Sequence, residues 1–134
     1  MIILDSTFLI DYLKKDKKAI DTLSKFLEKN EILATTAINV FEIFNGIYYL
    51  DEQKQDVVLA EVSRLLSYLT ILELTSDSAA SCSRIFAYLR KKGIVIEDTD
   101  ILISGIAIFN RANKICTRNH SHFSKIPGIQ VITY

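Results

Sequence analysis

Short apolar runs alternate with helical patterns along the whole chain. Residues 2–4 (Ile-Ile-Leu) are too few for a helix and too apolar for a surface loop, so they predict a buried strand. Comparable runs predict strands at residues 31–35, 70–74, 114–117 and 129–133. Apolar side chains at helical spacing predict helices over about residues 6–13, 20–27, 37–50, 58–69, 77–92 and 99–110, with a loop over 118–125.

Polar residues mark the ends of these helices. Gly93 follows Arg90-Lys91-Lys92, which is typical of a helix that ends in a left-handed residue with basic side chains in its last turn. Side chains that can accept a hydrogen bond from the first helical turn predict N-caps at Ser6 or Thr7, Thr35 or Thr36, and Ser76 or Asp77.

The alternation of strands and helices predicts an α/β fold. Short apolar strands separated by helices favour a central parallel sheet of four to five strands, with helices on both faces and right-handed crossovers. The chain has 134 residues, a length typical of one domain, and no repeat or linker interrupts it, so residues 1–134 are expected to form a single domain. Hydrophobic residues make up 49% and charged residues 24%, which indicates a globular chain and not a disordered one.

Charge, apolar stretches and cysteine content indicate what the chain can bind, where it is located and the state of its thiols. Sixteen basic side chains balance sixteen acidic ones, so any binding of a polyanion must come from local clusters. The first residues lack the basic segment of a signal peptide and no apolar stretch is long enough to cross a bilayer, so a soluble, cytoplasmic protein without membrane contact is expected. Cys82 and Cys116 lie among apolar residues, which predicts buried free thiols.

Five acidic side chains occupy positions where charge is hard to explain. Asp5 directly follows the first strand, Glu42 lies inside an apolar helix, and Asp98 and Asp100 open another apolar helix, with Glu97 as a weaker fifth. An acid among apolar residues must be paired, protonated or bound to a cation. A structural alternative exists for two of them, because Asp98 suits an N-cap and Asp100 would benefit from the helix dipole.

Taken together, the acids predict one cation site. The carboxyl ends of parallel strands share one edge of the sheet, and ligands bind outside that edge. Two carboxylates about 4 Å apart repel by roughly 4 kcal/mol at an effective dielectric constant near 20, so clustered acids raise a pKa or hold a cation. Carboxylate oxygens without a set of thiolates or imidazoles suit Mg²⁺ or Mn²⁺ better than zinc.

Several segments of the chain resemble those of a known family in order and spacing. They are residues 3–11, the stretch from Thr36-Ala37-Ile38 through Glu42 to Gly46, residues 96–107, and Thr117-Arg118-Asn119 followed by Phe123 and Ile126-Pro127-Gly128. In these segments the chain resembles the PIN-domain ribonucleases and, among them, the VapC-type toxins of bacterial and archaeal toxin–antitoxin pairs.

The resemblance implies a PIN-like three-layer sandwich and a metal-dependent endoribonuclease. It implies that Asp5, Glu42 and Asp100 are the catalytic and metal-binding acids, with Mg²⁺ as the cofactor and Mn²⁺ as an alternative. In-line attack of a water on an RNA phosphodiester would be the reaction, assisted by the cation. The implied biological role is the toxin of a type II, VapBC-like pair, with RNA as substrate, a cognate VapB-like antitoxin as partner, and a homodimer as the oligomeric state.

Other positions are assigned supporting roles by the same resemblance. Asp98 lies where some relatives carry an acid, so it is an auxiliary metal ligand. Asn119 falls at the family's fourth acidic position, where its carbonyl can hold a water but adds no charge. Thr7 keeps a hydroxyl near the metal, and Ser104, one turn after Asp100, can face the same side.

Two groups of side chains permit both a functional and a structural interpretation. Arg90, Lys91, Lys92 and Arg118 can contact the RNA backbone, although a basic run at a helix end is also a common solvated cap. His120 and His122 form an H-x-H pair that can bind a transition metal, but the neighbouring acids prefer a hard cation and so favour phosphate contact over metal binding; exposed loop histidines without a role are also common.

Aromatic side chains form a stripe on the helix over residues 37–50. Phe41, Phe44 and Tyr48 recur at helical spacing, with Tyr49 beside them, and they fit either core packing or an interface with a second chain.

Other functions need residues that the chain lacks or has changed. A phosphohydrolase with Asp5 as nucleophile usually has a second acid two residues on, where this chain has Thr7. A receiver-like phosphoacceptor needs paired acids at the first strand and a late lysine in the site, and neither is clear. A degenerate PIN domain that binds RNA or protein without cutting remains the principal alternative, because Asn119 is not an acid.

Overall fold

The computed structural model describes residues 1–134. Its strands are β1 (Ile2–Leu4), β2 (Leu33–Thr36), β3 (Thr70–Leu72), β4 (Lys114–Cys116) and β5 (Gln130–Ile132). Its helices are α1 (Ser6–Leu13), α2 (Lys17–Glu28), α3 (Ala37–Tyr48), α4 (Glu52–Leu66), α5 (Ser76–Lys91), α6 (Asp98–Phe109) and α7 (His120–Phe123). The predicted alternation of strands and helices is confirmed, with boundaries shifted by a few residues.

All five strands pair in parallel in one sheet of order β3-β2-β1-β4-β5. The first strand lies at the centre, where Ile3 pairs with Ala34 of β2 on one side and with Ile115 of β4 on the other. Because the strands are parallel, their carboxyl ends meet at one edge. The expected parallel sheet is therefore confirmed, and it has five strands.

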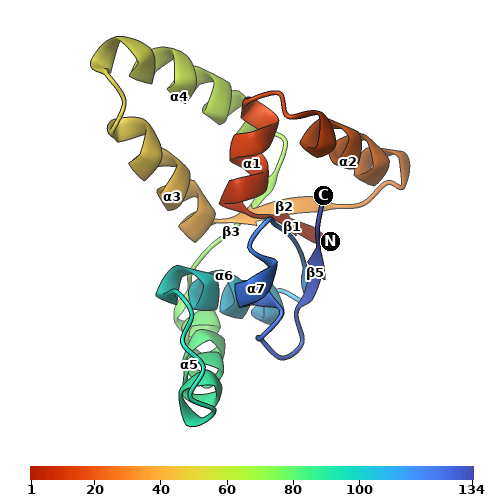
Figure 1. Cartoon of the computed structure of the whole chain (residues 1–134), viewed down its shortest axis with the longest axis vertical. Helices are drawn as coiled ribbons and strands as arrows, with labels where there is room; N and C mark the ends of the chain where they lie inside the picture. Colours follow the sequence, from red (N-terminus) through yellow and green to blue (C-terminus); the bar gives the residue numbers. More distant parts are fainter.

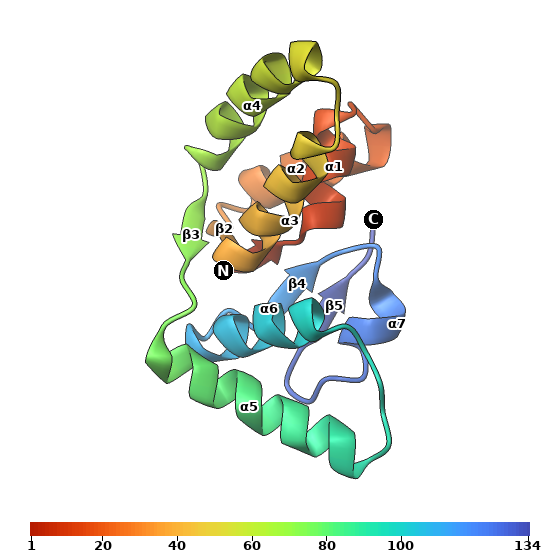
Figure 2. The ribbon, with the colours of Figure 1, turned by 90° about the vertical axis from the view of Figure 1, so that its left-hand side faces the viewer.

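Helices cover both faces of the sheet and make three layers (Figure 1 and Figure 2). Successive residues of a strand point to opposite faces. Ile2 and Leu4 accordingly pack with buried residues of α1, α2, α3 and α4, whereas Ile3 packs with those of α5 and α6. The layers explain why β1 is apolar at every position, since both of its faces are covered.

The helix starts differ from the predictions at two places. Asp5 is the N-cap residue of α1, but its carboxylate makes no capping hydrogen bond and is used elsewhere. Thr75 caps α5, where Ser76 or Asp77 was expected, because Thr75 and Ser78 form a reciprocal capping box. The prediction of Thr36 as the cap of α3 is confirmed.

Helix α7 lies inside the segment that was predicted to be a loop. It has four residues, and a single turn carries too little periodicity to be recognised in a sequence. Its Phe123 is completely buried in the core beneath α5 and α6, together with Ile126. This anchor fixes the position of the polar residues that surround it.

Other expectations concern the thiols and the membrane. Cys82 and Cys116 are buried free cysteines, as predicted. Helices α5 and α6 pack closely, since a Cβ atom added to Gly105 would lie 2.7 Å from the backbone of Cys82. The helices of the structure are all too short or too polar to span a membrane.

Candidate active site

Polar side chains gather where the carboxyl ends of β1 and β4 meet the first turns of α3 and α6. Asp5 follows β1, Thr117 and Asn119 follow β4, and Asp100 lies in the first turn of α6. Hydrogen bonds link these segments although they are about a hundred residues apart in sequence, as in the bond between Thr117 and Asp5. The expected meeting of acids at this edge of the sheet follows from the parallel topology.

Asp5 is buried and held by three hydrogen-bond donors. The amide of Asn39 donates to its Oδ1 at 2.8 Å, and the hydroxyls of Thr7 and Thr117 donate to its Oδ2 at 2.9 Å and 2.7 Å. Asp5 is only 3% exposed, so these donors replace the water that the carboxylate loses. They also fix its rotamer.

Two of these donors were not among the predicted site residues. Asn39 is completely buried in α3, and its side chain also closes the capping box with Thr36. Its sequence signal is the same as that of Glu42, namely a polar residue in an otherwise apolar helix. Thr117 gave no such signal, because a threonine at the end of a strand is common.

Glu42 lies one turn after Asn39 and is partly buried. Its Oε2 accepts a hydrogen bond from Ser6 at 2.7 Å. Burial raises the pKa of Glu42, and the charges of Asp5 and Glu97 raise it further, while hydrogen bonds from Ser6 and Thr99 oppose the increase. A carboxylate with these surroundings can hold a proton more readily than a solvated one.

Asp100 is 5% exposed and has two donors on one oxygen. Asn119 Nδ2 lies 2.9 Å and His122 Nδ1 lies 2.7 Å from Asp100 Oδ2. Burial raises the pKa of Asp100 from 3.8 to about 6; the contact with His122 opposes this increase, and the charge of Asp5 adds to it. The influence of Asp5 on both other acids shows that the three carboxylates share one electrostatic environment.

Ser104 provides an unpartnered polar atom near this cluster. Its hydroxyl is buried without a hydrogen-bond partner, and it lies one turn after Asp100 on the same face of α6. Leaving such a group unpaired costs about 1 to 3 kcal/mol. A polar ligand or a bound water would satisfy it.

The donor set fits a hard divalent cation that keeps several waters. Carboxylate, amide and hydroxyl oxygens are the ligands of Mg²⁺ and Mn²⁺, and Mg²⁺ is commonly held by one or two carboxylates only. The described chain has no group of three or more His, Cys, Asp or Glu side chains close enough to enclose a metal ion. Water and substrate oxygens would therefore complete the coordination.

The two acids beside Asp100 occupy different surroundings. Asp98 is exposed and lines a cavity between α5 and α6 with Phe86 and Leu102. Glu97 is the N-cap residue of α6, and its charge raises the pKa of both Glu42 and Asp100. Glu97 is thus electrostatically coupled to the cluster, although the sequence indicated it as a weaker candidate for the site than Asp98.

The basic residues singled out in the sequence divide into two groups. Arg118 lies beside the cluster, where its backbone N–H donates to Thr7 Oγ1 and its Nε is 3.0 Å from Asp11 Oδ2. Tyr134 donates to the same oxygen of Asp11 at 2.8 Å. Arg90, Lys91 and Lys92 form the exposed end of α5.

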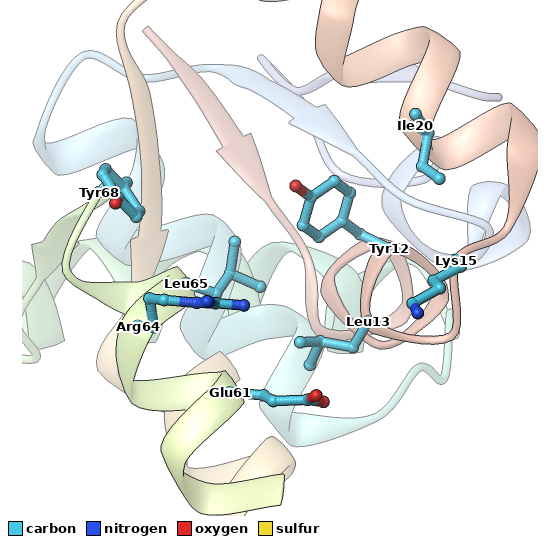
Figure 3. A pocket seen from close by; sticks show the side chains of 8 residues that line it. All are labelled: Tyr12, Leu13, Lys15, Ile20, Glu61, Arg64, Leu65 and Tyr68. Carbon is cyan, nitrogen blue, oxygen red and sulfur yellow. The ribbon is translucent and has the colours of Figure 1, made fainter.

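Two apolar cavities lie away from the carboxylates. One of about 290 Å³ lies between α1, α2 and α4, and Tyr12, Leu65 and Tyr68 are among the side chains that line it (Figure 3). Another of about 410 Å³ lies between α1, α3 and α4. Neither includes Asp5 or Asp100, so these cavities belong to the helical layer and are separate from the carboxylate cluster.

The aromatic stripe of α3 is not core. Phe41, Tyr48 and Tyr49 are 61%, 63% and 85% exposed, and of the four aromatic residues only Phe44 packs against the core. Exposed aromatic side chains that lie together are typical of surfaces that bind another chain. The structure therefore favours the interface over core packing for this stripe.

The fold and the site place the chain in the class of parallel α/β sandwiches that carry a carboxylate cluster at the carboxyl edge of the sheet. Comparison with known families shows to which family of this class the chain belongs. The model of the PIN domain family matches residues 2–129, so the chain belongs to the PIN domain family.

Curated relatives match over nearly the full chain. It is 28% identical to Ribonuclease VapC1 of Methanocaldococcus jannaschii, a match that covers 93% of this chain and 80% of that protein. It is 26% identical to Ribonuclease VapC19 of Mycobacterium tuberculosis, over 97% of this chain and 98% of that protein.

Solved structures share the fold. VapBC2 from Rickettsia felis, bound to a DNA fragment from its promoter, matches with a TM-score of 0.87 and 23% identity, over 100% of this chain and 99% of that chain. DNA-bound VapBC from Salmonella typhimurium matches with a TM-score of 0.82 and 26% identity, over 98% of this chain and 96% of that chain. These likenesses confirm the predicted three-layer PIN fold.

Proposed function

We propose that this chain is a metal-dependent endoribonuclease and the toxin of a type II toxin–antitoxin pair. The observation that carries the proposal is the hydrogen-bonded chain that joins Asp5 through Thr117 and Asn119 to Asp100 at the carboxyl edge of a PIN-domain sheet, with Glu42 one turn after the Asp5 donor Asn39. Relatives named Ribonuclease VapC match over most of their length and support the same activity. Mg²⁺ is the proposed cofactor and Mn²⁺ its substitute, because the donors are hard oxygen ligands.

Each carboxylate has a proposed role. Asp5 and Asp100 would hold the cation, which when bound supplies positive charge to polarise the phosphate and its attacking water. Hydrogen bonds fix Asp5 through both oxygens and Asp100 through one, so the two ligands keep their orientation without the cation. Ser6 donates to Oε2 of Glu42, and the Glu42 carboxylate would orient the water and accept its proton.

The proposed contacts with RNA involve the basic side chains. The side chain of Arg118 is 59% exposed and its guanidinium is anchored by Asp11, while its backbone N–H donates to Thr7 at the edge of the cluster. Lys91 and Lys92 are exposed at the end of α5, and the segment over residues 93–97 joins that end to the first turn of α6. Together they would supply the local positive charge that a chain with zero net charge needs to bind RNA.

Partner chains are proposed for the helical layer. The solved complexes that resemble this chain are named VapBC, which supports a cognate VapB-like antitoxin as partner. The exposed aromatic residues Phe41, Tyr48 and Tyr49 would take part in an interface, either with the antitoxin or in a homodimer.

A pair of isosteric substitutions tests the activity. Asp5→Asn and Asp100→Asn should each abolish Mg²⁺-dependent RNA cleavage while the far-ultraviolet circular dichroism stays unchanged, because each removes a ligand charge and keeps the volume. Asp77→Asn is the matched control, since Asp77 is an exposed acid in the first turn of another helix, α5. The three variants are purified identically, so a contaminating ribonuclease would cut RNA equally in all of them. Full activity in Asp5→Asn or Asp100→Asn would refute the proposal.

A second candidate is a degenerate PIN domain that binds RNA or protein without cutting it. Asn119 is the observation that favours it, because the family's fourth acidic position lacks a charge here. This candidate predicts that the wild-type chain binds RNA in a salt-dependent manner and leaves it intact with Mg²⁺ or Mn²⁺. Cleavage that disappears in Asp5→Asn excludes it.

A further inference from the structure

His122 belongs to the carboxylate cluster although its position in the sequence suggested an exposed loop. It lies on α7, and Phe123 beside it is completely buried, which fixes this short helix against the core. The ring nitrogen Nδ1 of His122 lies 2.7 Å from Asp100 Oδ2. His120 lies two residues away on the same turn and is exposed. Side chains two apart on a helix do not face each other, so the two histidines do not form a chelating pair.

The 2.7 Å contact needs a hydrogen between Nδ1 of His122 and Oδ2 of Asp100. When Asp100 is ionised, as a metal ligand is, only the ring nitrogen can supply it, so we assign the proton to Nδ1. Asn119 Nδ2 is also a donor, and it lies 2.9 Å from the same oxygen. Asn119 Nδ2 and His122 Nδ1 lie 3.0 Å apart, because both nitrogens approach Asp100 Oδ2.

This convergence distinguishes the two oxygens of Asp100. Oδ2 accepts from both Asn119 and His122, whereas Oδ1 takes part in no hydrogen bond. The segment that carries these donors is also tied to the other ligand. The backbone N–H of Asn119 donates to Thr117 Oγ1, and this hydroxyl donates to Asp5 Oδ2. One short stretch after β4 thus orients two carboxylates.

We propose that His122 is a positioning residue for the divalent cation: by donating a hydrogen bond to Oδ2 of Asp100, it fixes the carboxylate and leaves Oδ1 as the oxygen that would bind the cation. The inference rests on the proposed metal dependence of this site. Residues that hydrogen-bond a ligating carboxylate fix its orientation, and their loss typically reduces metal affinity by about 10- to 100-fold. His122 acts here through Asp100 and does not need to touch the cation.

Isosteric substitutions separate hydrogen bonding from packing. Asn can place an amide donor close to the position of Nδ1, whereas Leu has nearly the same size and no donor. His122→Ala and His122→Leu should therefore weaken cation binding, and His122→Asn should restore it. His120→Ala is the matched control, because it removes an imidazole from the same helix without affecting Asp100.

Binding of Mn²⁺ to the purified full chain, without RNA, measures the effect directly. The concentration of free Mn²⁺ is measured by electron paramagnetic resonance at pH 8, and thermal unfolding of each variant verifies its fold. The dissociation constant is expected to rise by about 10- to 100-fold in His122→Ala and His122→Leu, and to stay within about threefold of wild type in His122→Asn and His120→Ala. Equal Mn²⁺ affinity in the Leu and Asn variants would overturn the proposal.

The same titration separates this inference from the proposed function. A wild-type chain that binds no Mn²⁺ would overturn both the metal dependence and the role of His122. Wild-type binding that is lost in Asp100→Asn but unchanged in His122→Leu would overturn the role of His122 alone. Loss in Asp100→Asn and His122→Leu, with recovery in His122→Asn, is the result expected.

Discussion

Replacement of Asp100 by Asn should stabilise the metal-free protein while it abolishes the proposed activity. Asn has the volume of Asp and no charge, so it resembles the protonated acid that the burial of this site favours. The pKa of Asp100 rises from 3.8 to about 6 on folding, chiefly because the carboxylate is desolvated. The charged form therefore makes folding less favourable at neutral pH.

The size of the effect follows from this pKa. At 1.36 kcal/mol for each unit of pKa, the difference between 3.8 and about 6 corresponds to about 3 kcal/mol when the group is fully ionised. The exposure of Asp100 is only 5%, so solvent screening removes little of it. Because Asn cannot reproduce every contact of a protonated acid, we expect about 2 to 3 kcal/mol of stabilisation at pH 8. For a chain of this size that raises the Tm by roughly 6 to 12 °C.

The dependence on pH has a definite sign. The folded chain binds the proton more tightly than the unfolded chain, so the stability of the wild type rises as the pH falls from above 6 toward 4. Asp100→Asn lacks this titration. The difference in Tm between the variant and the wild type should thus be largest at pH 8, shrink below pH 6 and become small at pH 4, close to the pKa of 3.8 of the unfolded chain.

Differential scanning fluorimetry in EDTA, from pH 4 to pH 8, measures the Tm of the wild type and of Asp100→Asn as a function of pH. Asp98→Asn is the control for the loss of a negative charge at the N-terminus of α6, which should cost about 0.3 to 1 kcal/mol through the helix dipole. Asp98 is exposed and in the same turn, so its replacement should lower the Tm slightly at every pH. An Asp100→Asn variant that is no more stable than the wild type at pH 8, or whose advantage is independent of pH, would refute the reasoning.

Two further predictions concern packing and RNA contact. Gly105→Ala places a Cβ atom 2.7 Å from the backbone of Cys82, so it should lower the free energy of unfolding by about 1 to 3 kcal/mol in urea denaturation. An unchanged midpoint would mean that α5 can move away without cost. Replacing Lys91 and Lys92 together by Gln, in the Asp5→Asn background to prevent cleavage, should reduce the slope of log affinity for RNA against log salt by about 1.4 in fluorescence anisotropy. An unchanged slope would mean that both lysines only form the solvated end of the helix and do not contact RNA.

The fold was predictable because its central strand is covered on both faces. A buried parallel strand is apolar at each position, so residues 2–4 stand out from their polar surroundings, and Ile115-Cys116 of β4 form a second, shorter apolar run. Their order along the chain, separated by helices, restricts the topology to a parallel sheet. The parallel sheet in turn brings Asp5 and Asn119 to one edge, so these predicted site residues could be grouped without coordinates.

The partners of those acids were less predictable, for physical reasons. Asn39 and Thr117 act through single hydrogen bonds to Asp5, and a donor in a helix or at a strand end has many alternative roles in a sequence. His122 depends on a helix of one turn, whose position is set by the burial of Phe123 and not by a local pattern. Successive side chains of a helix point about 100° apart, so the residue at which α6 begins decides whether Glu97 or Asp98 lies near the cluster. Helix propensity does not define that residue.

Three unfavourable features occur together at this edge of the sheet. Burial and neighbouring charge raise the pKa of Glu42 and of Asp100, and the hydroxyl of Ser104 is buried without a partner. Each opposes folding, and proteins have a typical total stability of only about 5 to 15 kcal/mol. A hydrated cation bound between the carboxylates would relieve the charge repulsion and provide a water to the hydroxyl, so one ligand accounts for all three. Their coincidence at one site, in a chain whose sheet and helices otherwise satisfy the rules of burial, argues that the edge is shaped for ligand binding and not for stability.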